Sequence, residues 1–167
     1  YIFAMKTKLF LMSLICGLLL VGCGGTPYTK LSKTTKEKMD AVPAYAYDLK
    51  LMPEDMCLKY IELGEYEWNR RYGNLRVLTA GIVKDVLYFG FDSYGDESAS
   101  VSIVCKWKDK MNAPWEDSDF ECRFCEPDDV DLEEMTDRLR SGDEVIIIGN
   151  WFGCDVLEDC SLIYVKM

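Results

Sequence analysis

One long stretch, residues 75–89 (LRVLTAGIVKDVLYF), constrains the fold more than any other part of this sequence. It is rich in β-branched and aromatic residues, which favour β-strands, and its single glycine, Gly81, lies in the interior. A glycine inside a strand pattern usually marks a bulge or a sharp bend. A small Greek-key barrel needs a long, bent first strand, because that strand pairs within both halves of the sheet. We therefore predict that residues 75–89 form the first strand of a small β-barrel.

A helix is predicted directly before this strand, over residues 53–72. Pro53 is followed by two acidic residues, which is typical of a helix start, and the segment carries an apolar or small stripe at helical spacing. The stripe consists of Cys57, Ile61, Gly64, Trp68 and Tyr72. Because this face is apolar, we expect it to pack against the barrel, with a close approach at Gly64 beside the large ring of Trp68.

Four more strands and a second helix follow in the sequence. Alternating or continuous apolar residues predict strands over 100–107, 119–124, 144–149 and 156–165, and residues 128–140 form a short amphipathic pattern. The resulting order is one helix, three strands, a second helix and two strands. A helix between strands three and four is typical of the five-stranded Greek-key oligonucleotide/oligosaccharide-binding (OB) fold. We expect such a barrel, preceded by the N-terminal helix.

The N-terminal segment has the pattern of a secretory signal. We interpret Met5 as its start, since two lysines follow and then an apolar run over residues 9–21, which is shorter than the roughly 20 residues that span a bilayer. The run ends in Leu20-Val21-Gly22-Cys23, which resembles the lipobox of bacterial lipoproteins. That resemblance implies a signal peptide over residues 1–22 and lipidation of Cys23, and hence a domain held by its lipid anchor to a membrane of the bacterial cell envelope, on the periplasmic or the surface side.

Residues 23–52 are predicted to tether the folded domain, residues 53–167, to the membrane. Residues 24–44 are polar and rich in threonine and lysine without apolar periodicity, which indicates a flexible stalk. Beyond it the charge changes sharply, because residues 44–167 contain 13 Lys and Arg against 27 Asp and Glu. Nucleic acids are bound largely through Lys and Arg at their phosphates. From this charge we expect no nucleic-acid partner.

Several segments of the predicted barrel also resemble a named family. They are the helix that ends at Tyr72, residues 79–83 (TAGIV), Cys122 in the third strand, residues 139–149 (LRSGDEVIIIG) and residues 157–161 (LEDCS). These segments are similar to those of the tRNA_anti-like family, OB-fold domains of bacterial envelope proteins, many of which are lipoproteins. The resemblance implies an OB fold over about residues 54–165 and says little about the ligand.

Six of the eight cysteines would remain in the exported, lipidated protein. In an exported chain six cysteines indicate disulfide bonds, although six allow 15 pairings. Strand alternation places Cys105, Cys122 and Cys160 on core-facing positions. The family resemblance implies a disulfide between Cys122 and Cys160. It leaves open the pairing of Cys57, Cys105, Cys125 and Cys154.

The Cys122 and Cys125 pair forms a C-x-x-C motif, so a redox or metal-binding lipoprotein is the alternative function. Reactive cysteines of the thioredoxin type lie at a helix N-terminus, whereas this pair lies on a strand. A structural zinc site would need a second close pair, and Cys154 and Cys160 are spaced more widely than typical ligand pairs. We therefore expect disulfides or buried thiols here, with no metal and no cofactor.

The sequence contains no histidine, which excludes Ser/His/Asp and Cys/His catalysis. No two carboxylates stand out as an acid and a base, so we expect no enzyme. The aromatic residues predicted to bind a ligand are Trp107, Trp151 and Phe152. The last two lie in the turn between strands four and five, which OB folds use for binding, although they could instead cap the end of the barrel. We expect a non-catalytic module that binds an envelope protein, a peptide or a glycan; single-stranded nucleic acid is less favoured.

Overall fold

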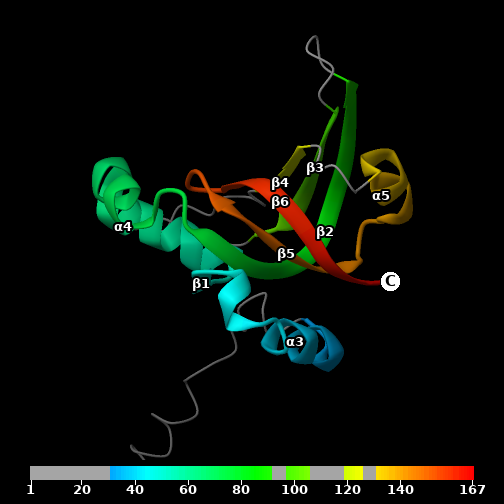
Figure 1. Ribbon diagram of the computed structural model, residues 1–167, viewed down its shortest axis with the longest axis horizontal. Coiled ribbons are helices and arrows are strands. Elements are labelled where there is room, and N and C mark those ends of the chain that lie inside the picture. Colours follow the sequence, from blue (N-terminus) through cyan, green and yellow to red (C-terminus); the bar gives the residue numbers. More distant parts are fainter. Residues whose placement is uncertain (1–30, 92–96, 106–118, 126–130) are drawn as a thin grey trace, which may run out of the picture.

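The computed structural model describes residues 31–91, 97–105, 119–125 and 131–167, which form a six-stranded mixed sheet with three α-helices (Figure 1). The elements are α3 (Lys33–Asp40), the 3-10 turn η1 (Ala44–Ala46), β1 (Leu49–Lys50), α4 (Pro53–Tyr72), β2 (Arg76–Phe91), β3 (Glu97–Val104), β4 (Asp119–Cys125), α5 (Leu132–Arg138), β5 (Glu144–Trp151) and β6 (Val156–Lys166). The strand order is β1-β2-β3-β4-β6-β5, and β2 also pairs with β5. The sheet therefore closes into a ring. None of the helices in the described ranges is long and apolar enough to cross a membrane.

Strand β2 serves both halves of the ring, as the sequence predicts. Its residues 76–82 pair antiparallel with β5, and its residues 83–91 pair antiparallel with β3. The strand curves strongly between the two partners (Figure 1). The register with β5 is unbroken at Gly81, so the bulges lie further on, after Val83 and after Tyr88. Gly81 has a different role, because a Cβ there would lie 1.9 Å from Cγ2 of Ile103 on β3.

The predicted order of helices and strands is confirmed from α4 to β6. Strand β4 lies between β3 and β6, antiparallel to the first and parallel to the second. This is the arrangement expected when the third of five barrel strands neighbours the second and the fifth. The sequence analysis missed β1, a two-residue strand that adds to β2 in parallel through Leu49 and Lys50.

Helix α4 has the predicted bounds but a break in its middle. Gly64 has φ 73° and ψ 160°, which are not helical angles and favour glycine. A Cβ at Gly64 would meet no atom within 4 Å, so the predicted close approach at this position is wrong. The two halves of α4 still reach the interior, because Cys57 before the break and Trp68 after it are buried in the core inside the ring.

The flexible stalk predicted for residues 24–44 is wrong from Leu31 onward. Helix α3 packs on the outer face of β2 and β5, where Leu31 and Met39 are buried. Leu31 and Met39 form an outer apolar cluster with Leu78, Ala80, Ile146 and Ile148. A short helix with so few apolar residues shows little apolar periodicity in its sequence. Its docking is therefore evident only from the strands that it packs against.

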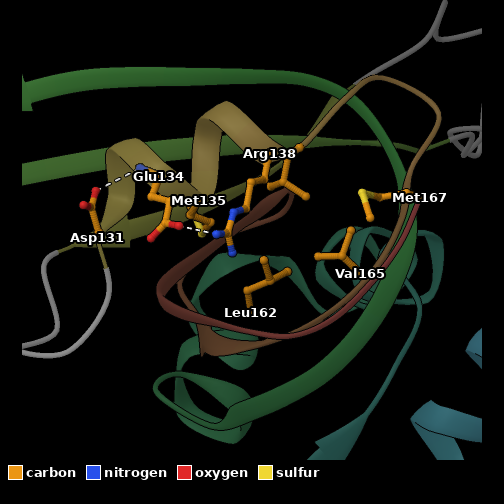
Figure 2. A pocket seen from close by; sticks show the side chains of 8 residues that line it. Asp131, Glu134, Met135, Arg138, Leu162, Val165 and Met167 are labelled. Atoms are coloured by element: carbon orange, nitrogen blue, oxygen red, sulfur yellow. Dashed lines mark hydrogen bonds and ion pairs between the residues drawn. The ribbon is translucent and has the colours of Figure 1, made fainter.

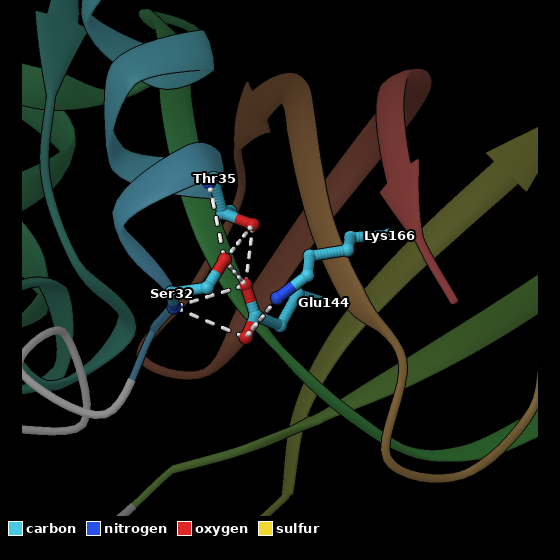
Figure 3. Close-up of polar contacts among 4 residues, drawn as sticks. All are labelled: Ser32, Thr35, Glu144 and Lys166. Carbon is cyan, nitrogen blue, oxygen red and sulfur yellow. Dashed lines mark hydrogen bonds and ion pairs between the residues drawn. The ribbon is translucent and has the colours of Figure 1, made fainter.

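A partly buried carboxylate, that of Glu144, fixes the start of α3 (Figure 3). Both oxygens of Glu144 on β5 accept hydrogen bonds of 3.0 Å from the backbone N–H of Ser32, and one also accepts from the Ser32 hydroxyl at 2.6 Å and from the Thr35 hydroxyl. Lys166 Nζ lies 3.7 Å from the same carboxylate. Burial acts to raise the pKa of Glu144, but the hydrogen bonds from Ser32 and Thr35 outweigh it and lower that pKa. The hydrogen bonds of Ser32 and Thr35 with Glu144 join residues more than 100 positions apart.

Candidate ligand pocket

A pocket of about 420 Å³ opens between α5 and the end of β6 (Figure 2). Its lining residues are Asp131, Glu134, Met135, Arg138, Leu139, Leu162, Val165 and Met167. The volume lies within the range of small-molecule sites, about 300–1,000 Å³. This pocket is a candidate ligand site whose lining consists of residues that the structure describes.

Helix α5 presents its charged side chains along the rim of the pocket. Asp131 caps the helix by accepting a hydrogen bond of 2.8 Å from the backbone N–H of Glu134. Leu132 is buried in the core, which holds α5 against the ring and fixes which face points outward. On that outward face Glu134 and Arg138, one turn apart, form an ion pair (Figure 2).

The floor of the pocket is apolar and its rim carries more negative than positive charge. Met135 and Leu139 come from the α5 side, and Leu162 and Val165 come from β6. The rim has two carboxylates against one guanidinium. The described lining supplies no hydroxyl or thiol that could act as a nucleophile. Such a surface can bind an apolar group and orient a polar or positively charged end.

Tyr88, on the part of β2 adjacent to the pocket, carries a hydroxyl group that is held in a hydrogen bond. Its hydroxyl donates to the carboxylate of Glu97, which faces it from β3. This bond, together with burial and nearby carboxylates, raises the pKa of Tyr88 to about 12. The phenol is therefore protonated at neutral pH and acts as a hydrogen-bond donor.

The aromatic residues predicted to bind a ligand lie elsewhere, and Trp151 is inaccessible. Its ring is fully buried and packs edge-on against Trp68, with the centroids 5.2 Å apart, and beside Tyr72 at 5.5 Å. Its indole N–H donates a hydrogen bond of 2.7 Å to the backbone oxygen of Gly153. Trp151 therefore closes the end of the ring near α4. The neighbouring Phe152 is 60% exposed and stays available, whereas Trp107 lies outside the described residues.

Cys122 and Cys160, which the family resemblance pairs in a disulfide, both carry free thiols in the structure. Both are buried, and burial together with a hydrogen bond to the Cys160 thiol raises the pKa of Cys122. Gly149 makes room for this pair, since a Cβ there would lie 2.6 Å from Sγ of Cys160. A disulfide between the two stays a prediction. The other member of the C-x-x-C motif, Cys125, is exposed on the opposite face of β4.

Sequence reasoning missed the pocket, although the predicted amphipathic segment 128–140 and the predicted last strand 156–165 contain part of its floor. The stripe of α5 contains Met135 and Leu139, and the last strand contains Leu162, but each pattern indicates only a buried face. The hollow exists because these faces meet without filling the space between them. A single sequence carries no signal for such a mismatch of shapes.

No protein-family model matches this sequence, and no curated protein sequence matches it. Several solved structures, among them the following three, have a similar backbone fold. The first is a lipoprotein from Klebsiella pneumoniae, named as a candidate nucleic acid-binding protein, with 17% identity and a TM-score of 0.49 over 75% of this chain and 97% of that one. The second is a small single-stranded DNA-binding protein from Streptomyces coelicolor, with 10% identity and a TM-score of 0.32 over 56% and 92%. The third is yeast Stn1 and Ten1, with 11% identity and a TM-score of 0.40 over 77% and 69%.

These comparisons correct the expectation that nucleic acid is excluded as a partner. Proteins named for binding nucleic acid or single-stranded DNA are among the chains with a similar path. The exclusion rested on the net charge of the whole domain. Binding depends on the local potential at one face, and a domain of net negative charge can still present a face that accepts a polyanion. Membership of the tRNA_anti-like family is not confirmed, since no family model matches.

Proposed function

We propose that this chain is a lipid-anchored protein of the bacterial cell envelope, of the tRNA_anti-like type, whose OB-type domain is a non-catalytic binding module. The observation that carries the binding function is the α5–β6 pocket, with its apolar floor and charged rim. The OB assignment is supported by the strand order, in which β2 closes the ring on β3 and on β5 and a helix, α5, stands between β4 and β5. The anchor is supported by the lipobox-like residues 20–23.

The ligand that best matches the pocket has an apolar group next to a positive charge, as in a peptide segment with an apolar residue beside Lys or Arg. Met135, Leu162 and Val165 would contact the apolar group. The carboxylate of Glu134 would face the charge, in competition with its present partner Arg138. The rim of this pocket carries two carboxylates, Asp131 and Glu134, against the one guanidinium of Arg138, and this local charge favours such a ligand over an anionic one.

A pair of probes with the same alkyl chain and opposite charges tests this proposal. Octyltrimethylammonium and octyl sulfate, both below their micelle concentrations, would be titrated into the isotopically labelled chain and followed by amide chemical shifts. We expect shifts at α5 and the end of β6, with tighter binding of the cation. Equal binding of both probes, or shifts confined to another surface, would overturn the assignment of the pocket.

Glu134→Gln and Glu133→Gln are matched variants for this experiment. Both remove one charge from the same turn of α5, but only Glu134 lines the pocket. Glu134→Gln should weaken binding of the cation by about two- to fivefold, which corresponds to a partly exposed ion pair. Glu133→Gln should change it less. An equal loss in both variants would indicate a general charge effect with no specific site.

Single-stranded nucleic acid is a second candidate ligand, and the outer face of β2, β3 and β4 favours it. Leu87 and Phe89 on β2 are 48% and 59% exposed, and they flank a row of serines on β3. Exposed aromatic rings beside small polar residues can stack with bases. On β4, Arg123 pairs with Glu121 and Glu158, so a phosphate would have to displace these carboxylates.

Fluorescence anisotropy with a labelled 15-residue oligothymidylate tests the second candidate. Phe89→Ala should weaken binding, whereas Tyr66→Ala, which removes a 79% exposed ring from α4, should not. Binding that is absent in the wild-type chain, or that both variants weaken equally, would count against this face.

The anchor has its own test, which is independent of the ligand. Cys23→Ser should release the protein from the membrane fraction without changing the thermal unfolding of the domain, because anchor and fold lie in separate segments. Recovery of Cys23→Ser with the membrane as efficiently as the wild type would contradict the lipoprotein assignment.

A further inference from the structure

Three thiols from three separate elements meet at the α4 side of the ring. Cys57 lies near the start of α4, Cys105 directly follows β3, and Cys154 lies in the turn between β5 and β6. The Cys57 thiol donates a hydrogen bond of 3.1 Å to the backbone oxygen of Cys154. The thiols of Cys105 and Cys154 lie close enough to it to raise its pKa. Cys57 is therefore the centre of the group, with one thiol on each side.

The three thiols differ in their access to solvent. Cys57 and Cys105 are almost completely buried, with exposed fractions of 0% and 1%, whereas Cys154 is partly exposed. The pKa values of Cys57 and Cys154 are shifted in opposite directions. Hydrogen bonds with Cys105 and Cys154, together with burial, raise the pKa of Cys57. The hydrogen bond from Cys57 lowers the pKa of Cys154, against burial and the charge of Asp155.

We propose that Cys154, Cys57 and Cys105 form a thiol–disulfide exchange site, at which Cys154 reacts with the disulfide of a small oxidised thiol and passes it to the buried Cys57–Cys105 pair. Within the described ranges no three or more His, Cys, Asp or Glu side chains are arranged to hold a metal ion. The site is distinct from the α5–β6 pocket, because α4 and α5 lie on opposite sides of the ring (Figure 1).

The first reaction takes place at the accessible thiol. The Cys154 thiol loses its proton, and its thiolate attacks one sulfur of the small disulfide RS–SR. The S–S bond breaks, one RS⁻ leaves and takes up a proton, and Cys154 carries a mixed disulfide. Cys57 then loses its proton and attacks Sγ of Cys154, which releases the second RSH. Two protein thiols have been oxidised and one RS–SR has been reduced to two RSH.

The second reaction moves the disulfide into the core without further oxidation. Cys105 loses its proton and attacks Sγ of Cys57, so that Cys154 leaves as a thiolate and takes up the proton. Cys57 and Cys105 are almost completely buried, so small thiols in solution reach their disulfide poorly and the product persists. The product is a buried Cys57–Cys105 disulfide that links α4 to the end of β3, with Cys154 again free to react.

Timed trapping of the full chain, purified in detergent and first reduced, tests the proposal. Glutathione disulfide is added, samples are quenched with N-ethylmaleimide, and the cysteine peptides are mapped without reduction. In the wild type we expect a transient glutathione adduct on Cys154 followed by a Cys57–Cys105 disulfide. Cys154→Ser should slow that disulfide by about tenfold or more, since the buried thiols are reached poorly from solvent.

Two further variants separate the steps of the proposed exchange. Cys57→Ser should trap the glutathione adduct on Cys154, and Cys105→Ser should stop at a Cys57–Cys154 disulfide. Cys125→Ser, which removes an exposed cysteine outside the group, is the control and should behave as the wild type. Circular dichroism of every variant checks that it folds. A chemical control uses the folded Cys125→Ser protein with Cys154 alkylated. Its Cys57–Cys105 disulfide should form as slowly as in Cys154→Ser, although none of the three thiol residues has been substituted.

Two results would overturn the proposal. One is a Cys57–Cys105 disulfide that forms as fast in Cys154→Ser, or after alkylation, as in the wild type. The other is a wild-type chain in which glutathione disulfide leaves Cys57 reduced or joins it to a cysteine outside the group.

Discussion

The two halves of β2 carry similar outward-facing side chains but have different surroundings. In the half that pairs with β5, Leu78 and Ala80 are fully buried under α3. In the half that pairs with β3, Leu87 and Phe89 keep about half of their surface exposed, at 48% and 59%. We refer to residues 76–82 as the covered half and residues 85–91 as the open half.

The difference shows that apolar residues on a strand do not by themselves determine what covers them. The covered half is buried because Glu144, on the neighbouring strand, fixes Ser32 and Thr35 at the start of α3. The apolar contacts of Met39 then complete the docking of the helix. Exposed apolar side chains on the open half mark a surface that is available for a partner.

The largest effect is expected at the junction of the two halves. Gly81→Ala should lower the free energy of unfolding by about 3 kcal/mol, because the new Cβ would overlap Cγ2 of Ile103 and force β2 away from β3. Urea unfolding measures the change. Gly153→Ala is the control, since a Cβ there meets no atom within 4 Å. Equal stability of the two variants would show that the curved strand tolerates the overlap.

A substitution in the covered half should have the next largest effect. Met39→Ala should destabilise the domain by about 2 kcal/mol, because Met39 is 1% exposed and its removal leaves a cavity beneath α3. Hydrogen exchange should show faster exchange in α3 and in the covered half than in the open half. A loss below about 0.5 kcal/mol would mean that α3 contributes little to the folded state.

Removal of the carboxylate at the start of α3 should cost somewhat less, and the cost should depend on pH. Glu144→Gln should destabilise the protein by about 1–2 kcal/mol at neutral pH, because charge-assisted hydrogen bonds are replaced by weaker ones. The pKa of Glu144 is lower in the folded chain than its ordinary value of 4.5. The charged form therefore stabilises the fold above pH 4.5, and this contribution is lost as the pH falls through the lower, folded pKa.

Denaturant unfolding of the wild type and Glu144→Gln between neutral pH and pH 3 measures this dependence. The difference between the two proteins should shrink as the pH falls below 4.5. A difference that is constant across this range would show that the carboxylate does not stabilise α3 through its charge.

The smallest effect on stability is expected in the open half. Phe89→Ala should change the free energy of unfolding by less than about 0.5 kcal/mol, since the ring is mostly exposed and few contacts are lost. Thermal unfolding of Phe89→Ala and Met39→Ala, measured side by side, compares how much the open half and the covered half contribute to stability. If Phe89→Ala were as destabilising as Met39→Ala, the open half would be covered in solution.

The sequence by itself determined the order of the elements from α4 to β6 and the closure of the ring. Gly81 in a long β-branched stretch identified the strand that pairs on both sides, and the helix over residues 53–72 was predicted with its bounds. Strand alternation also placed Cys122 and Cys160 in the interior. These features were predictable because each depends on the period of apolar residues along a single element.

The tertiary structure decided what packs against each face. The docking of α3, the burial of Trp151, the three-thiol group and the α5–β6 pocket all depend on residues far apart in the chain. The contact of Ser32 with Glu144 spans 112 positions. Local patterns report that a face is apolar but not which segment will cover it or how well the shapes will fit. Which segment covers an apolar face depends on how segments far apart in the sequence pack together. This is therefore seen only in the folded chain.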